Sequence, residues 1–346
     1  MNQQNATNVG LSSSRGRGAR VSFKSLRGIL LPFPTPFGPD GDIDEQALSS
    51  NIKKWNGTGV IGYVALGSTG ERVHLEEREC VRVIELARAA VPDDLALIVG
   101  AGQQSTRGTI NEIKAAVACG AEAVLVITPY FYRRAITPAA LSSHYVAVAD
   151  ASPVPVILYS MPDLTGVAIE PETVARLSEH PNIIGIKDSS DDLARLGETI
   201  GLVTDDFAVL TGNGTVLDGA LRSGAQGAIL AVGCAAARQC IAIFEAVRRG
   251  DYERASALQE ILTPLTRAVT TRFGIGGLKA AMDLIGYHGG CVRAPLQAPG
   301  EAEREEIARL LRRAGATKLQ EREMREQVGD VERIGDAKSF AGALSQ

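Results

Sequence analysis

Cysteine and histidine, the residues that form disulfides and bind many metals, are scarce in this sequence. The chain of 346 residues has five cysteines, an odd number with no Cys-x-x-Cys pair, and four scattered histidines. Cys80 and Cys240 fall on apolar faces of predicted helices, as reduced core residues do. We therefore predict no disulfide framework, no metal and no cofactor.

Long apolar runs and an excess of positive charge are also absent. No segment reaches the length of a membrane span, and the N-terminus lacks the hydrophobic centre of a secretory signal, so we expect a cytoplasmic protein without membrane contact. The formal net charge of −4 argues against a nucleic-acid-binding surface. The expected partner is a small molecule, and an anionic substrate has to be attracted by local groups.

Acidic residues are missing from the start of the chain, where none precedes Asp40. Residues 1–26 are instead rich in Ser, Gly, Asn and Arg, a composition that favours a flexible N-terminal tail. The alternative is a mitochondrial transit peptide, although Gly10, Gly16 and Gly18 weaken any amphipathic helix there.

From residue 27 onward, short β-rich runs alternate regularly with helical patterns. Eight such units favour a closed (βα)8 barrel of the TIM type, because parallel strands need helical crossovers and eight of them close efficiently. An open doubly wound sheet is the alternative. The expected strands are Ile29–Leu31, Ile61–Leu66, Leu95–Val99, Ala123–Ile127, Pro155–Tyr159, Ile183–Lys187, Phe207–Thr211 and Ala228–Val232.

The same pattern divides the chain after the N-terminal tail. Residues 27–233 are expected to form the barrel, and residues 234–314 its last helix and a helical extension. The extension has helical patterns near residues 252–268, 275–286 and 301–313. Residues 315–346 have mixed charges and little apolar pattern, and we expect a weakly ordered tail there.

Lys187 ends a short apolar strand and is the most informative residue of the chain. The strand of isoleucine and glycine is typical of one buried on both faces, so it delivers an amine into a poorly hydrated site. Loss of water favours the neutral amine, the form that attacks a ketone to give a Schiff base. The alternative is a lysine that merely extends from a strand end into solvent.

Two further strand ends meet Lys187 on one face if the fold is a barrel. Tyr159 closes the fifth strand, and Ser68 and Thr69 follow the second in a turn with free backbone amides. An amine, a phenol and an anion-binding turn suit a 2-oxo acid, with an iminium on the lysine, the carboxylate in the turn and protons relayed by the phenol. The alternatives are a tyrosine packed at the barrel rim and a simple helix cap.

The chain has the motifs Leu31-Pro32-Phe33-Pro34-Thr35-Pro36-Phe37, Gly67-Ser68-Thr69-Gly70-Glu71, Thr128-Pro129-Tyr130, Tyr159 before Pro162, and Gly185-Ile186-Lys187-Asp188. With these motifs, residues 27–300 resemble the dihydrodipicolinate synthase and N-acetylneuraminate lyase superfamily of class I aldolases. The resemblance implies that Lys187 carries a Schiff base with pyruvate, that Tyr159 acts as acid and base, and that Ser68 and Thr69 bind the carboxylate or relay protons. It also implies a homotetramer or a homodimer.

Departures from the family pattern favour one branch of it. Synthases of the lysine pathway usually have an arginine where this chain has Leu164, and a second tyrosine where it has Phe131. Segments such as Leu158-Tyr159-Ser160-Met161-Pro162 are most similar to 4-hydroxy-2-oxoglutarate aldolases. We therefore expect a carbon–carbon lyase that cleaves 4-hydroxy-2-oxoglutarate, or a 2-keto-3-deoxy sugar acid, to pyruvate and an aldehyde.

Two other functions remain open at this point. One is the synthase itself, which condenses pyruvate with aspartate semialdehyde, and the other is a non-catalytic barrel that binds oxo acids. Further residues that we expect to bind the substrate are Tyr130, Ser189 and Asn213, which follow the fourth, sixth and seventh strands.

Overall fold

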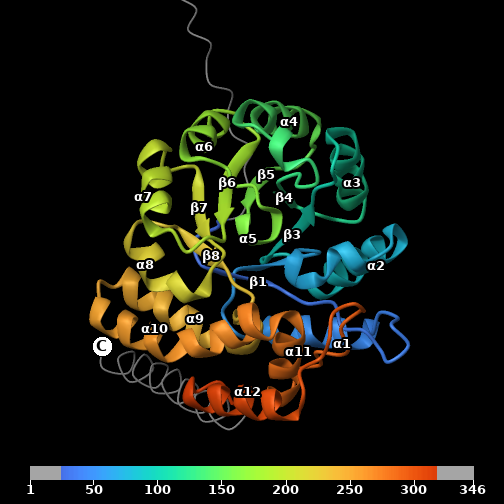
Figure 1. Cartoon of the computed structure of the whole chain (residues 1–346), viewed down its shortest axis with the longest axis vertical. Coiled ribbons are helices and arrows are strands. Elements are labelled where there is room, and N and C mark those ends of the chain that lie inside the picture. The colour runs from blue at the N-terminus through green and yellow to red at the C-terminus, as the bar shows by residue number, and fades with distance from the viewer. Residues whose placement is uncertain (1–24, 318–346) are drawn as a thin grey trace, which may run out of the picture.

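Eight parallel strands form a closed barrel in the computed structural model, which describes residues 25–317. Each strand pairs with its neighbour in the chain, and β1 pairs with β8 to close the barrel (Figure 1). The predicted (βα)8 barrel is therefore confirmed, and the doubly wound sheet is excluded. The strands are β1 (Ile29–Pro32), β2 (Gly62–Ala65), β3 (Ala96–Ala101), β4 (Ala123–Ile127), β5 (Val156–Ser160), β6 (Ile183–Asp188), β7 (Ala208–Thr211) and β8 (Gly227–Ile229).

Helices surround the barrel, and several begin at a side chain that caps their first free backbone N–H groups. Asp44 accepts a hydrogen bond from the backbone N–H of Ala47, and Thr137 precedes Pro138 at the first position of its helix. The barrel helices are α1 (Glu45–Trp55), α2 (Glu77–Ala90), α3 (Thr106–Ala118), α4 (Pro138–Ala151), α5 (Pro162–Thr165), α6 (Pro171–Ser178), α7 (Leu193–Leu202), α8 (Leu217–Arg222) and α9 (Gly233–Arg248).

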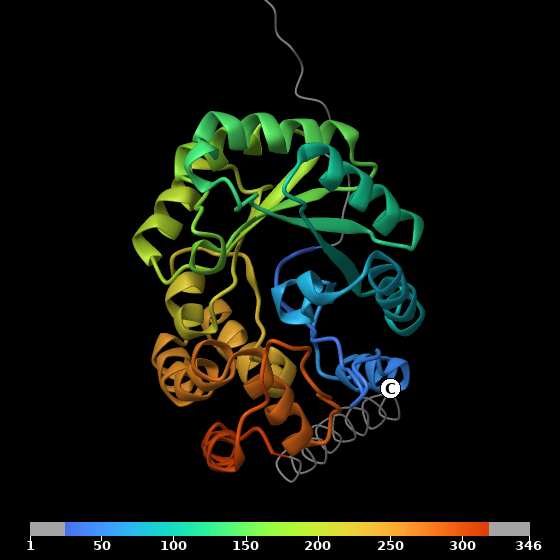
Figure 2. The ribbon, with the colours of Figure 1, turned by 45° about the vertical axis from the view of Figure 1, so that its right-hand side comes forward.

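The C-terminal extension consists of α10 (Tyr252–Arg267), α11 (Gly274–Ile285) and α12 (Glu301–Arg313). These helices lie together at one side of the barrel, where α10 and α11 pack against α9 (Figure 2). The predicted tails over 1–26 and 315–346 lie outside the described residues except at 25–26 and 315–317.

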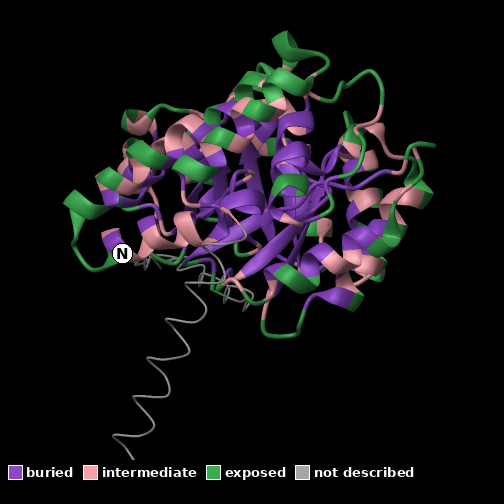
Figure 3. Cartoon of the chain, turned by 90° about the horizontal axis from the view of Figure 1, so that it is seen from below, coloured by how far each residue is buried: buried purple, intermediate pink, exposed green. Residues whose placement is uncertain are grey.

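Alternate residues of each strand point to opposite faces of the sheet and so pack into two separate hydrophobic cores. Inward side chains such as Leu30, Ile98 and Leu125 fill the barrel, and outward ones such as Val126 and Leu158 pack against the helices. Buried residues accordingly follow the strands and the inner helix faces (Figure 3). Among the described residues, no helix is both long and apolar enough to span a bilayer.

Candidate active site

Lys187 and Tyr159 face the barrel interior side by side. They are paired positions on β6 and β5, so both side chains point inward at the same level. The Lys187 Nζ lies 4.2 Å from the centroid of the Tyr159 ring. The two residues are only 6% and 4% exposed, so little water competes for the amine.

The Tyr159 phenol lies in a polar pocket that changes its acidity. Burial would raise the pKa of this phenol, but the positive charge of Lys187 opposes that effect. Hydrogen bonds with Ser68, Ser189 and Lys187 also favour the phenolate, and the pKa lies below its usual value of 10.0. The hydroxyl oxygens of Ser68 and Tyr159 are 3.3 Å apart. A phenol of lowered pKa beside an amine can both give and accept protons.

The turn after β2 presents Ser68 to this phenol. Ser68–Gly70 forms one turn of 3-10 helix, η1, in which Thr69 is buried. The Thr35 hydroxyl donates a 2.8 Å hydrogen bond to the Gly70 carbonyl and so ties the turn to the segment after β1.

A cavity of about 270 Å³ opens beside Ser68 and Tyr159. Its wall includes Tyr130 after β4 and Leu164 of α5, along with the charged side chain of Arg72. Its volume is sufficient for a small substrate, and most of the wall is apolar. We did not single out Arg72 from the sequence, because one cation after a turn carries no distinctive pattern.

Gly212, directly after β7, allows the lysine and its neighbours to pack closely. A β-carbon at this position would lie 2.5 Å from Lys187 Cε and 2.0 Å from Ser189 Oγ. Ser189 therefore belongs to the same cluster. Asn213 instead caps the short helix η4 (Gly214–Val216), where its Oδ1 accepts hydrogen bonds from the N–H and the hydroxyl of Thr215. Its expected contact with substrate stays a prediction.

Behind the turn, a buried ion pair connects η1 to the C-terminal extension. Glu71 follows the turn in a left-handed conformation, with φ 55°, which is strained for a residue other than glycine. Its Oε1 lies 2.5 Å from Lys279 Nζ, and both side chains are about 98% buried or more. Burial lowers the pKa of Lys279, and the charge of Glu71 opposes this shift.

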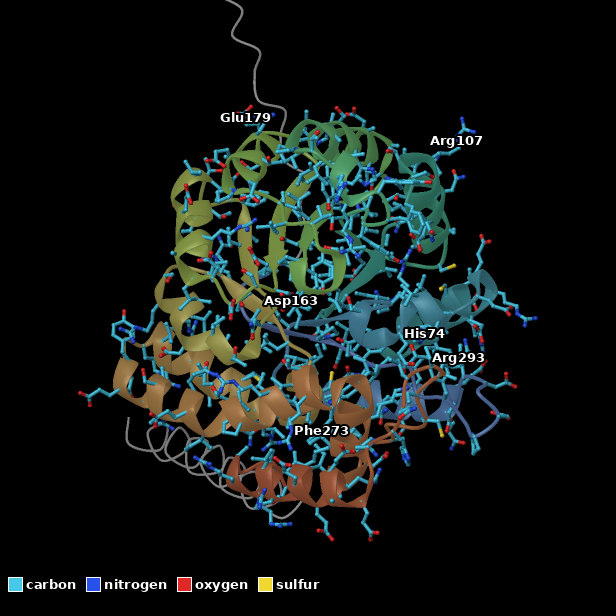
Figure 4. The ribbon with its side chains drawn as sticks, in the orientation of Figure 1. His74, Arg107, Asp163, Glu179, Phe273 and Arg293 are labelled. Carbon is cyan, nitrogen blue, oxygen red and sulfur yellow. The ribbon has the colours of Figure 1, made fainter. Side chains whose placement is uncertain are left out.

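Arg293 holds the other side of this carboxylate. Its backbone N–H donates to Glu71 Oε2 at 3.0 Å, and its guanidinium donates to the His74 carbonyl at 2.8 Å. Figure 4 shows His74 and Arg293 close together beside α2. Lys279, a charged residue inside the otherwise apolar helix α11, is the sequence feature that could have indicated this cluster. We assigned it no role.

We predict that Lys279→Met lowers the free energy of unfolding by about 3–5 kcal/mol, because it leaves the Glu71 carboxylate buried without its cation. The double variant Glu71→Gln/Lys279→Met should recover much of this loss, since glutamine can still accept from the Arg293 N–H. Urea unfolding measures both effects.

The matched control is Arg82→Met, which breaks an exposed ion pair with Glu45 and should change stability little. Equal stability of Lys279→Met and the wild type would contradict a structural role for the buried pair.

Comparisons with known proteins agree with this architecture. The model of the Dihydrodipicolinate synthetase family matches residues 25–314. A 4-hydroxy-tetrahydrodipicolinate synthase of Syntrophus aciditrophicus is 36% identical over 290 residues, which are 84% of this chain and 99% of that protein. The enzyme of the same name from Methanothrix thermoacetophila is 35% identical over 281 residues, 81% of this chain and 94% of its own.

A solved structure is also similar. The chloride-inhibited dihydrodipicolinate synthase of Acinetobacter baumannii in complex with pyruvate has a TM-score of 0.80 and 30% sequence identity, over 84% of this chain and 100% of that one.

These relatives correct the function expected from the sequence. The prediction that the chain cleaves 4-hydroxy-2-oxoglutarate or a 2-keto-3-deoxy sugar acid is wrong, because relatives that match most of its length are named as synthases. The prediction gave too much weight to Leu164 as a missing cation. In the structure Arg72 lines the same cavity as Leu164.

Proposed function

Because the chain belongs to the Dihydrodipicolinate synthetase family and is a carbon–carbon lyase, we propose that it is a 4-hydroxy-tetrahydrodipicolinate synthase that condenses pyruvate with aspartate semialdehyde. The observation that carries the proposal is the buried contact between the Lys187 amine and the Tyr159 phenol, at 4.2 Å from amine to ring centroid. The names of relatives that match most of the chain support the choice of second substrate.

In this proposal Lys187 attacks the ketone carbon of pyruvate. The nitrogen forms a bond to that carbon, the oxygen leaves as water, and an iminium results. Loss of a proton from the methyl carbon gives an enamine, which attacks the aldehyde carbon of the second substrate and forms the new C–C bond. The cationic nitrogen accepts the electron pair left by the first proton, and the neutral enamine nitrogen then donates it toward the aldehyde carbon, whose oxygen takes up a proton. The amine of aspartate semialdehyde then attacks the re-formed iminium carbon and displaces Lys187 as the free amine.

Tyr159 is proposed to move the protons of this sequence. Its hydroxyl is within 3.3 Å of Ser68 Oγ, which gives a route for a proton toward the cavity. Ser68 and Thr69 are proposed to hold the pyruvate carboxylate with the free amides of their turn. Tyr130 and Ser189 are proposed to border the bound substrate, since Tyr130 lines the cavity and Ser189 contacts the phenol.

A direct assay tests the function. Purified protein given pyruvate should consume it only when aspartate semialdehyde is present, and this rate should exceed pyruvate release from any 4-hydroxy-2-oxo acid. Pyruvate is measured in both directions with lactate dehydrogenase. A faster release than consumption would reject the synthase.

We also propose that the protein is a homo-oligomer. Large apolar side chains are exposed near the cavity at Val73, Phe131 and Tyr132, which a partner subunit would cover. Sedimentation of the purified protein as a monomer would reject this proposal.

A further inference from the structure

We propose that Arg72 binds the carboxylate of the second, aldehyde substrate, in place of the arginine that is absent at position 164. This inference rests on the proposed function, because it concerns the same cavity. The recognised group is a carboxylate on a short aldehyde that reaches the pyruvate-bound Lys187.

The position of Arg72 supports this role. Arg72 and Leu164 line one cavity with Ser68 and Tyr159, although they come from different loops, η2 (Arg72–His74) and α5. A ligand that extends from the phenol into this cavity can therefore contact the Arg72 side chain. The chain has a net charge of −4, so an anionic reactant needs such a local cation.

The hydrogen bonding of Arg72 leaves one buried donor unpaired. Its Nη2 forms an ion pair with Glu112 Oε1. The other oxygen of this carboxylate, Oε2, accepts a 2.8 Å hydrogen bond from the Gly102 N–H. Among residues 25–317, the buried Nε of Arg72 has no hydrogen-bond partner. A guanidinium has five N–H donors, and a buried donor without a partner is costly unless a ligand satisfies it.

A second arginine near α5 is a weaker candidate. Arg133 packs on Gly166, where an added β-carbon would lie 2.9 Å from its Cδ. However, Arg133 is exposed and lines a separate small cavity with Glu170, which does not include Tyr159. Arg72 is thus the better placed of the two guanidinium groups.

The first test measures binding without catalysis. Borohydride reduction of the pyruvate adduct fixes pyruvate on Lys187 and removes the reactive enamine, so an added aldehyde can bind but cannot condense. Calorimetry then compares succinic semialdehyde, which has a carboxylate, with propanal, which has none. We expect Arg72→Leu to weaken succinic semialdehyde binding roughly 10–100-fold and to leave the pyruvate adduct and propanal binding unchanged.

Two further variants test whether the guanidinium itself is what binds the carboxylate. Arg72→Leu/Leu164→Arg returns a guanidinium to the cavity from α5 and should recover affinity for the carboxylate. Arg72→Lys keeps the positive charge but loses the planar guanidinium, so it should weaken succinic semialdehyde binding less than Arg72→Leu does. If Arg72→Leu does not fold, Arg72→Lys takes its place in the comparison. The control is Arg107→Leu, because Arg107 is exposed at the edge of the molecule in Figure 4 and should leave binding unchanged.

The outcomes separate this inference from the proposed function. If Arg72→Leu binds succinic semialdehyde as the wild type does, or the wild type binds both aldehydes equally, the role of Arg72 is rejected, even if condensation occurs. If Arg72→Leu weakens only the carboxylated aldehyde but the wild type does not condense aspartate semialdehyde with pyruvate, the role of Arg72 stands and the synthase is rejected.

Discussion

Lys187→Ala should abolish the condensation of pyruvate, with kcat lower by roughly 10⁴–10⁶-fold, as for other enzymes that lose the nucleophile of a covalent intermediate. Alanine cannot form the iminium, and without it the methyl carbon of pyruvate has beside it only the neutral ketone, a much weaker electron acceptor. The measurement is pyruvate consumption together with mass spectrometry after borohydride treatment. Wild-type protein should gain a reduced pyruvate adduct at Lys187, and the variant should gain none.

The control for this prediction is Lys114→Ala, on the exposed face of α3. It should keep both the activity and the adduct, since its side chain is not buried. An adduct on a different lysine, or condensation by Lys187→Ala near the wild-type rate, would disprove imine chemistry at this position.

Tyr159→Phe should lower kcat by about 10²–10⁴-fold, the usual contribution of a positioned acid or base. The ring remains to fill the barrel, so the fold should be retained. Because the Lys187 amine also remains, we expect the pyruvate adduct to form, although more slowly. Steady-state kinetics gives the first effect, and the time course of borohydride trapping gives the second.

Tyr252→Phe is the matched control, because this tyrosine is exposed at the start of α10 and far along the chain from β5. A Tyr159→Phe enzyme with normal kcat would mean that another group moves the protons. A variant with low kcat but an unfolded circular dichroism spectrum would assign the residue to packing instead.

The barrel could be predicted from local patterns because parallel buried strands leave a strong signal. The fourth strand was expected at Ala123–Ile127 and lies there. The eighth was expected at Ala228–Val232 but is Gly227–Ile229, and α9 begins at Gly233. Leu230 and Val232 remain buried after the strand ends, so the apolar run does not mark the boundary.

The site was predictable only in part. The resemblance to the superfamily is confirmed by the family model over residues 25–314. The ends of the fifth and sixth strands predicted that Tyr159 lies beside Lys187, and the structure has this contact. The second half of the cavity was not predictable, because Arg72 and Leu164 are separated in sequence and meet only in the folded barrel. A motif within one loop cannot indicate that a cation from a different loop lines the same cavity.

The ion pair of Glu71 with Lys279 makes the support of the Ser68 turn depend on residues much later in the chain. All eight strands are complete when the ribosome has passed Ile229, yet Glu71 then lacks both Lys279 and the Arg293 backbone that hold it. A nascent chain at that stage has every proposed catalytic group but an unanchored carboxylate beside its Ser68 turn. The position of the Ser68 turn should thus depend on the C-terminal extension, although every proposed catalytic side chain comes from the barrel.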